Sequence, residues 1–346
     1  MRRNLVPSPD AAQKTTIVIR RSVTLFGRPV SLLTIGAAAV IVFGAAALVF
    51  TATREEQRAG LHRTTIDVGD APQALGHGPE GLWVVLGGDS AVKSINVSDG
   101  SLGPLVELEA IPGGVAVGDG SVWVGSIQGS AIKRVHQSSN VGRPRVTDIP
   151  VGQTPQSVAL GGDLLWVAAF DDGSIWRVDP DSGKVHGDPI ELANAFPSAL
   201  AVGFGSVWVT DVVDNTVLRL DESTGELQET IPVGDSPTGV AAGEGGVWVT
   251  NFGDATVTHI DPETDSVVGT AIVVGGKPGS ITTGLGYVWV TRPEDDSLIR
   301  IDPDESEWTG EVFDVGDGPQ GVTVAAGSVW VADQGSDTVT KLTPEE

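Results

Sequence analysis

Short runs of apolar residues recur along most of the chain at fixed distances from tryptophan. Seven tryptophans stand 40 to 43 residues apart, and each follows a proline by eleven positions. The tryptophans are Trp83, Trp123, Trp166, Trp208, Trp248, Trp289 and Trp330, and the prolines are Pro72, Pro112, Pro155, Pro197, Pro237, Pro278 and Pro319. Self-similarity at such a period is typical of repeat architectures, in which each repeat is one supersecondary unit.

Each repeat contains four apolar runs. In residues 237–275 these are GVAA, GVWVT, TVTHI and VVGTAIVV, and the segments between them, GEGG, NFGDA and DPETD, have turn composition. Four short strands in a period near 41 residues are typical of a propeller blade. Near-continuous apolar runs fit strands that are buried on both faces. The sequence therefore predicts an all-β fold, a seven-bladed β-propeller of four-stranded blades.

The two ends of the repeat region predict how the ring closes. Residues 64–69, TTIDVG, match the fourth strand of other repeats but follow no first three strands, and the last repeat ends after its third strand. Because an open ring would leave exposed strand edges, we expect residues 64–68 to supply the outer strand of the last blade. The propeller then spans residues 64–346.

Residues 30–50 form an uncharged and mostly apolar run, VSLLTIGAAAVIVFGAAALVF. As a helix at ~1.5 Å per residue it would span roughly 30 Å, the thickness of a bilayer core. A buried core helix and a cleaved signal peptide are the alternatives, but the run is longer than a signal-peptide core of ~7 to 15 residues. We predict one transmembrane signal anchor at 30–50, after a basic cytoplasmic tail at 1–29 and before a linker at 51–63.

The distribution of charge indicates how the chain is oriented in a membrane, and charge and cysteine content exclude some partners and sites. Residues 1–63 carry nine Lys and Arg against three Asp and Glu, which leaves 12 basic and 42 acidic residues for the rest of the chain. Six basic residues precede the apolar run, so the N-terminus is expected inside the cell and the propeller outside it, in a single-pass membrane protein. The acidic propeller argues against nucleic-acid binding, and the absence of cysteine excludes disulfides and thiolate sites.

The repeat resembles those of bacterial propellers of the YVTN and NHL types, which include YncE-like and virginiamycin B lyase-like proteins. The resemblance covers residues 64–343 and is carried by the P-x10-W spacing, by VWVT and IDPxTG-like segments, and by a V-G-x-x-P entry. That entry begins at Val68, Val151, Val233, Val274 and Val315. The resemblance implies the propeller fold but no single function, because such repeats serve enzymes, sensors and scaffolds.

Streptogramin lyases of this group are characterised by a histidine in a Pro-His-Gly turn and a glutamate in a Trp-Phe-Thr-Glu strand end, used with a divalent metal. Here the residue after the repeat proline is Gln73, Gly113, Gln156, Ser198, Thr238, Gly279 or Gln320. The third residue after the repeat tryptophan is Leu86, Ser126, Ala169, Asp211, Asn251, Arg292 or Asp333. Neither set contains the required side chain, so the resemblance does not carry the lyase activity to this chain.

These same two sets supply the candidate binding residues, because both are expected around the mouth of the central channel. We interpret Asp211, Asn251, Arg292 and Asp333, with Gln73, Gln156 and Gln320, as candidate ligand contacts; the alternative is a set of solvated strand ends. No catalytic residue is predicted. The histidines occupy unrelated repeat positions: His62, His77, His136, His186 and His259.

Five aspartates stand six residues after the tryptophan: Asp89, Asp172, Asp214, Asp254 and Asp295. Such regular repetition predicts that they accept hydrogen bonds from turn amides. Calcium or magnesium binding is the alternative where carboxylates cluster, although no loop has EF-hand spacing. No cofactor is required by the sequence.

Two classes of function remain. The first is a membrane-anchored, extracytoplasmic binding, scaffold or sensor module for a small-molecule, cell-wall or protein partner. The second is a metal-dependent enzyme of the lyase or lactonase kind, with its site at the mouth of the channel. The anchor and the missing catalytic set favour the first, and stoichiometric metal binding would favour the second.

Overall fold

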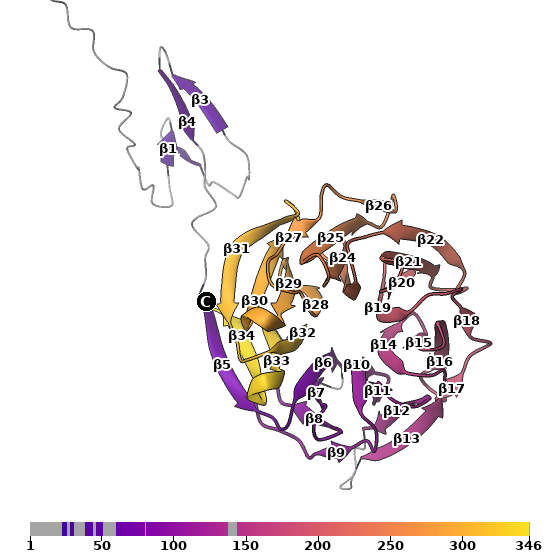
Figure 1. The fold of residues 1–346 in the computed structure, drawn as a ribbon. Helices are drawn as coiled ribbons and strands as arrows, with labels where there is room; N and C mark the ends of the chain where they lie inside the picture. The colour runs from indigo at the N-terminus through magenta and orange to yellow at the C-terminus, as the bar shows by residue number, and fades with distance from the viewer. Residues whose placement is uncertain are drawn as a thin grey trace, which may run out of the picture. The chain divides into compact units, whose positions relative to one another are not determined.

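The computed structural model describes residues 60–79, 81–137 and 144–345, and the backbone of four short strands closer to the N-terminus. Inter-residue contacts divide the chain into two units, Met1–Arg58 and Ala59–Glu346. The second unit contains seven antiparallel sheets arranged in a ring (Figure 1). The predicted all-β, seven-bladed propeller is therefore confirmed.

The innermost strand of each blade begins at or just after the repeat proline. These strands are β6 (Pro72–Gly78), β10 (Pro112–Gly118), β14 (Pro155–Gly161), β19 (Pro197–Gly203), β23 (Pro237–Gly243), β28 (Ile281–Gly284) and β32 (Pro319–Ala325). Each contacts the innermost strands of both neighbouring blades, and the contact between β32 and β6 completes the ring.

The second strand of each blade carries the repeat tryptophan. These strands are β7 (Gly81–Leu86), β11 (Ser121–Ser126), β15 (Leu164–Ala169), β20 (Ser206–Asp211), β24 (Gly246–Asn251), β29 (Tyr287–Arg292) and β33 (Ser328–Asp333). The third strands follow after a short turn: β8 (Ala91–Ile95), β12 (Ala131–His136), β16 (Ser174–Asp179), β21 (Thr216–Asp221), β25 (Thr256–Asp261), β30 (Ser297–Asp302) and β34 (Thr338–Pro344). In the last two blades that turn contains a single 3-10 turn, η2 (Pro293–Asp295) or η3 (Gln334–Ser336).

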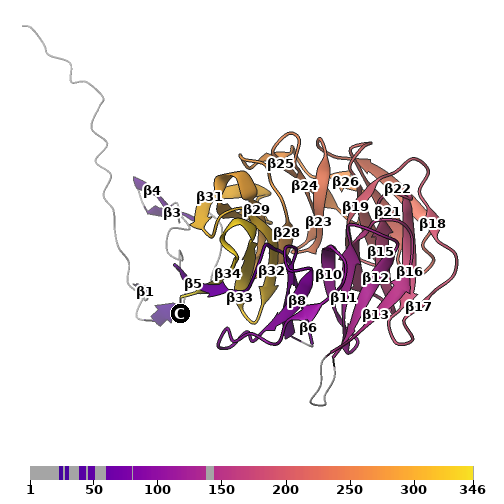
Figure 2. The ribbon, with the colours of Figure 1, turned by 60° about the horizontal axis from the view of Figure 1, so that its bottom comes forward.

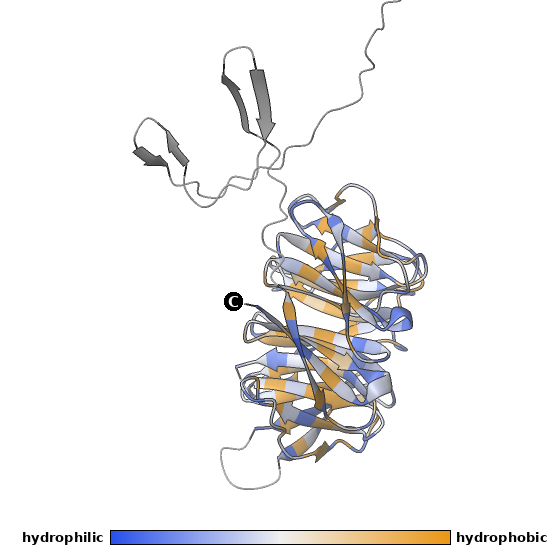
Figure 3. Ribbon diagram, turned by 90° about the vertical axis from the view of Figure 1, so that its left-hand side faces the viewer, coloured by the Kyte–Doolittle hydropathy of each residue, from blue (hydrophilic) through white to orange (hydrophobic). Residues whose placement is uncertain are grey.

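The outer strands are less regular than the inner three. They are β9 (Val106–Glu107), β13 (Arg145–Pro150), β17 (Lys184–Val185) with β18 (Ile190–Glu191), β22 (Leu227–Pro232), β26 (Ser266–Val267) with β27 (Ile272–Val273), β31 (Glu307–Asp314), and β5 (Leu61–Asp67) in the last blade. In the side view of Figure 3, hydrophobic residues concentrate on the strands.

The ring is closed by the N-terminal strand, as the sequence predicts. β5 pairs antiparallel with β34, from Asp67 opposite Thr338 to Leu61 opposite Pro344, so the two ends of the ring lie side by side (Figures 1 and 2). The strand begins three residues earlier than predicted, and the linker predicted at 51–63 is shorter by those residues. The seven paired residues cover the edge of β34 and complete the last blade as a four-stranded sheet.

The predicted membrane helix at 30–50 lies partly outside the described residues. Where it is described, its backbone forms β3 (Ala39–Phe43) and β4 (Ala46–Phe50), which pair antiparallel and are not helical. β1 (Val23–Leu25) and β2 (Arg28–Val30) form a similar pair. In the described part of the chain, no helix has both the length and the apolarity needed to cross a bilayer.

The core lies between blades, not within them. The tryptophans are buried, six of them at most 1 % exposed and Trp83 6 % exposed. A typical cluster packs Trp123 and Ile132 of the second blade on Val158, Leu165 and Val178 of the third. Each blade is therefore covered on both faces by its neighbours, which is why its second strand is apolar almost throughout.

A basic residue lies over most of the tryptophans, eleven positions later in the chain. Arg134, Arg219, Arg300 and Lys341 place their charges 4.6 to 5.9 Å from the ring centroids of Trp123, Trp208, Trp289 and Trp330, and His259 stacks on Trp248 at 3.8 Å. Several of these side chains also reach the following blade. Arg219 Nη1 donates to the Pro262 carbonyl 3.0 Å away, and Lys341 Nζ donates to the Val97 carbonyl at 2.9 Å, across the closure. These basic residues are not among the candidates predicted from the sequence.

Candidate functional site

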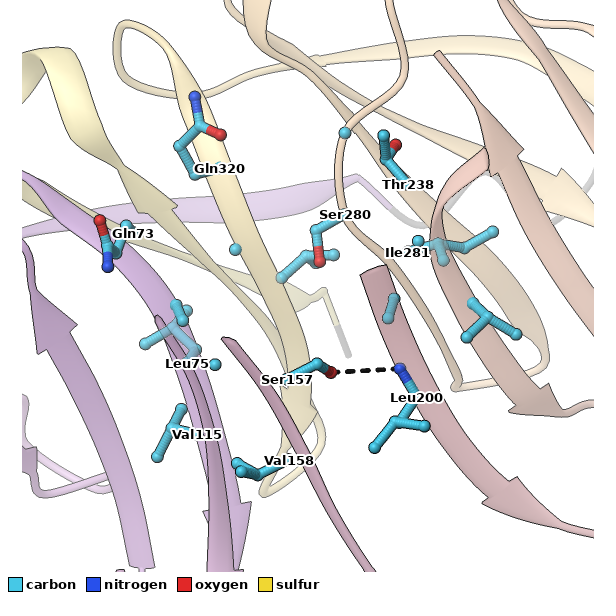
Figure 4. A pocket seen from close by; sticks show the side chains of 18 of the residues that line it. Gln73, Leu75, Val115, Ser157, Val158, Leu200, Thr238, Ser280, Ile281 and Gln320 are labelled. Carbon is cyan, nitrogen blue, oxygen red and sulfur yellow. Dashed lines mark hydrogen bonds between the residues drawn. The ribbon is translucent and has the colours of Figure 1, made fainter. Parts of the chain in front are cut away.

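A cavity of about 510 Å³ occupies the centre of the ring, and all seven blades contribute to it (Figure 4). Its walls are the first few residues of the innermost strands, with Phe252 and Pro293 added from the turns after the second strands. The volume lies within the ~300 to 1,000 Å³ typical of small-molecule pockets. These lining residues lie toward one face of the ring, the face at which the innermost strands begin, called here the mouth face.

The mouth face is defined by backbone hydrogen bonds between two sets of segments. In six of the seven blades, the residue that follows the second strand donates to the segment that enters the innermost strand, for example Gly87 N to Ala71 O, Phe170 N to Thr154 O and Phe252 N to Ser236 O. Both sets of turns therefore meet at one end of each blade, as predicted. The chain enters the propeller at the opposite end, where Glu345 N donates to Gly60 O.

An aliphatic ring forms the apolar part of the cavity wall. It consists of the third residue after each repeat proline: Leu75, Val115, Val158, Leu200, Val240, Ile281 and Val322. The residues just before them are all small, which lets neighbouring strands approach closely. A Cβ added at Gly321 would stand only 2.8 Å from the Ala74 Cα of the adjoining blade. Glycine is therefore needed there for the ring to close.

Uncharged polar side chains complete the wall, and some of them are free to bind a ligand. Ser157 Oγ is used by the protein, because it accepts a hydrogen bond from Leu200 N at 3.1 Å. Thr238 Oγ1 is buried and has no partner among the described residues. The side chains of Ser280 and Gln320 also make no hydrogen bond to the described part of the chain, and they lie on the next two blades.

None of the described residues that line the cavity has an ionisable side chain. The walls therefore offer hydrogen bonds and apolar contacts but no general acid, general base or nucleophilic thiolate of their own. A charged ligand would lose its hydration without gaining a counter-charge. This composition favours an uncharged ligand that is partly apolar.

The three predicted glutamines divide between the cavity and the blade contacts. Gln73 and Gln320 line the cavity. Gln73 Nε2 donates to the Pro112 carbonyl of the next blade, and Gln156 Nε2 donates to the Ser198 carbonyl at 3.4 Å. Gln156 is not among the lining residues, so Gln320 is the predicted glutamine best placed to contact a ligand.

The four predicted residues at the ends of second strands lie in the walls of the blades and do not line the cavity. Asp211, Asn251, Arg292 and Asp333 are each at most 8 % exposed. Asp211 Oδ1 accepts from the Phe196 and Val213 amides at 3.1 and 3.2 Å. Arg292 donates to Ser297 Oγ and to the Val274 carbonyl, and pairs with Asp295 at 3.2 Å. The polar arc predicted at the mouth is not formed by these side chains.

Asn251 and Asp333 occupy equivalent places in the fifth and seventh blades. Asn251 Nδ2 donates to the hydroxyls of Thr256 and Thr258, both at 2.9 Å. Asp333 Oδ2 accepts from the hydroxyls of Thr338 and Thr340 at 3.2 and 2.6 Å. Burial raises the pKa of Asp333, and the hydrogen bonds from Thr340 and from the Gly316 amide oppose that rise.

The aspartates six residues after tryptophan have the predicted structural role in three blades. The side chains of Asp89, Asp172 and Asp254 accept hydrogen bonds from the amides of Asp70, Gln153 and Asp235, at 3.0, 2.6 and 3.1 Å. These bonds hold each turn of the mouth face against the segment that enters the innermost strand. Within residues 60–79, 81–137 and 144–345, no three Asp, Glu or His side chains gather closely enough to hold a metal ion.

Comparisons with known proteins agree with the fold. No protein-family model matches the chain, and no curated protein matches it in sequence. Among solved structures, virginiamycin B lyase from Staphylococcus aureus is 19 % identical with a TM-score of 0.72, and the match covers 82 % of this chain and 99 % of that one. A streptogramin B lyase is 18 % identical, with a TM-score of 0.72 and 82 % and 98 % coverage.

A third match, Kuenenia stuttgartiensis hydrazine synthase, is 13 % identical with a TM-score of 0.68, over 80 % of this chain and 97 % of that one. At such identities the likeness concerns the fold. It confirms the resemblance to virginiamycin B lyase-like propellers in architecture.

Proposed function

We propose that the protein is a binding module that holds an uncharged, partly apolar small molecule in its central cavity. The observation that carries this proposal is a cavity of about 510 Å³ whose described walls contain no ionisable side chain. The aliphatic ring would hold the apolar part of the ligand. Thr238, Ser280 and Gln320, on three successive blades, would hydrogen-bond its polar part.

We further propose that the module is anchored to the cell membrane by residues 30–50, with the N-terminus in the cytoplasm and the propeller outside. The uncharged run and the basic residues before it support this arrangement. The chain enters the propeller at the end opposite the mouth face. Protease treatment of intact cells should degrade the propeller, and a protected propeller in the soluble fraction would contradict the proposal.

A thermal-shift screen of the full-length protein tests the choice of ligand class. The probes are matched pairs that differ in charge: lactones with their open hydroxy acids, and N-acetylglucosamine with glucosamine. A ligand present at ~100 times its dissociation constant adds about 2.7 kcal/mol of stability. We expect the uncharged member of a pair to raise the melting temperature more than the charged one. A preference for charged members would contradict the proposal.

A metal-dependent lyase or lactonase is the second candidate, favoured by the fold similarity to virginiamycin B lyase. This enzyme would need calcium or magnesium. No three Asp, Glu or His side chains of the described residues lie close enough together to bind the ion, so it would have to be bound by fewer such ligands. Incubating the protein with the same lactones, with and without EDTA, separates the two functions. Metal-dependent product formation would support the enzyme, whereas binding without turnover supports the binding module.

A further inference from the structure

Exposed apolar side chains gather on one part of the mouth face. We define the apolar arc as Ile127, Phe170, Phe196, Val213 and Phe252. Of these, Ile127 is 43 %, Phe196 37 %, Val213 58 % and Phe252 37 % exposed, and the rings of Phe170 and Phe196 lie 5.5 Å apart. The propeller contains only five phenylalanines, and three of them are in this arc.

The arc spans the second to fifth blades and stops there. Its members follow the second strands or precede the innermost ones, and backbone bonds join the two sets, as between Val212 N and Phe196 O at 3.4 Å. In the sixth, seventh and first blades, the position four residues after tryptophan is Pro293, Gln334 or Gly87. Because those blades fold without a large apolar residue there, the repeat does not require one in the other four.

Exposed carboxylates surround the arc. Asp171, Asp214, Asp235 and Asp254 lie in the same turns and are all exposed. The ammonium group of Lys277 lies 4.8 Å from the centroid of the Phe252 ring and pairs with Glu294 at 3.3 Å. The field at this face is therefore negative, which attracts cationic partners and repels acidic ones.

We propose that the apolar arc binds a polypeptide segment of a partner protein that carries aromatic or aliphatic side chains flanked by Lys or Arg. The apolar side chains would pack on Phe170, Phe196 and Val213, and the basic groups would face the surrounding aspartates. Phe252 also lines the cavity, but the other four residues of the apolar arc do not, so variants at Phe170, Phe196 and Val213 test the arc separately from the cavity ligand.

Fluorescence anisotropy of the full-length protein with short labelled peptides tests the proposal. The probe contains Lys, Phe and Gly, and two control peptides replace Lys by Glu or Phe by Ser. The double variant Phe170→Ser/Phe196→Ser should weaken binding of the probe about tenfold or more. Phe204→Ser is the matched control, because Phe204 is 47 % exposed but lies in the turn between β19 and β20, at the opposite end of the blade.

Val213→Ser tests the same arc at a position that contributes little to the core, should the double variant fold poorly. We expect weaker binding in Val213→Ser, weaker binding at high salt, and no binding of either control peptide. Equal binding by the arc variants and Phe204→Ser, or equal binding of the Glu peptide, would overturn the proposal. Absence of probe binding to the wild-type protein would overturn it as well.

Discussion

Replacing Asp333 by asparagine should stabilise the protein at neutral pH. The Asp333 carboxyl group is fully buried, Oδ2 accepts from two threonine hydroxyls, and no described donor completes a well-formed hydrogen bond to Oδ1. The fifth blade has an asparagine at this place, and its Nδ2 donates to the equivalent hydroxyls of Thr256 and Thr258. Asp333→Asn would therefore reproduce an arrangement that the same fold already contains, without a buried charge.

The pH dependence of this stabilisation follows from the raised pKa of Asp333. A folded-state pKa above the unfolded value means that the folded state holds the proton more tightly. The contribution of this carboxyl group to the stability of the wild-type protein is present at low pH and is lost as the pH rises from 3.8 through the folded-state pKa. Leaving a buried polar group without a hydrogen-bond partner costs about 1 to 3 kcal/mol, and more when the group is charged. For domains of about 150 to 250 residues, each kcal/mol changes the melting temperature by roughly 2 to 4 °C.

Calorimetric melting between pH 3 and pH 8 is the assay. Asp333→Asn should melt above the wild-type protein at pH 7, and the difference should vanish as the pH falls toward about 4. Asn251→Asp should show the mirror image, destabilised at pH 7 and restored in acid. Asp163→Asn, in an exposed turn, controls for net charge. A lower melting temperature for Asp333→Asn at pH 7, or a gain independent of pH, would refute the reasoning.

Three other predictions concern the ring. Arg219→Met removes the charge over Trp208 and the bonds to Pro262 and Asp265 in the next blade. It should lower the free energy of unfolding by about 1 to 3 kcal/mol, measured by thermal unfolding. Arg145→Met, at an exposed position, is the control. A chain that begins after Asp67 should lose cooperative unfolding, whereas one that begins at Gly60 retains β5 and should unfold cooperatively. Burial lowers the pKa of His259, so the stability of the protein should fall as the pH drops below about 6.5. Thermal unfolding followed by circular dichroism should show a smaller fall in His259→Gln.

The sequence predicts the ring because its constraints are local and repeated. The proline at or just before the start of each innermost strand and the tryptophan between blades recur at fixed positions, and the unmatched outer strand at the N-terminus specifies closure with β34. The turn aspartates such as Asp89 are predictable for the same reason. The prediction of a helix at 30–50 depends on a surrounding bilayer, and the described parts of this segment are extended strands.

The candidate site is only partly predictable, because polar character alone does not show where a side chain points. Asp211 and Asp333 end second strands, and those strands are covered by neighbouring blades on both faces, so their side chains enter the walls. Only innermost strands and a few turns reach the cavity. The aliphatic ring from Leu75 to Val322 is visible in the sequence as the third residue after each proline, and it is the signal that would have located the cavity wall.

The proposed cavity is tested most directly by ligand-induced melting shifts in two wall variants of the full-length protein. Ser280→Leu fills the cavity with an apolar side chain, and Gln320→Ala removes a free amide from its wall. The uncharged lactones and N-acetylglucosamine are the probes, and exposed Asp163→Asn serves as the control. We predict that a probe that stabilises the wild-type protein loses its effect in Ser280→Leu, is weakened in Gln320→Ala and is unchanged in the control. Equal shifts in all four proteins would contradict binding in the central cavity.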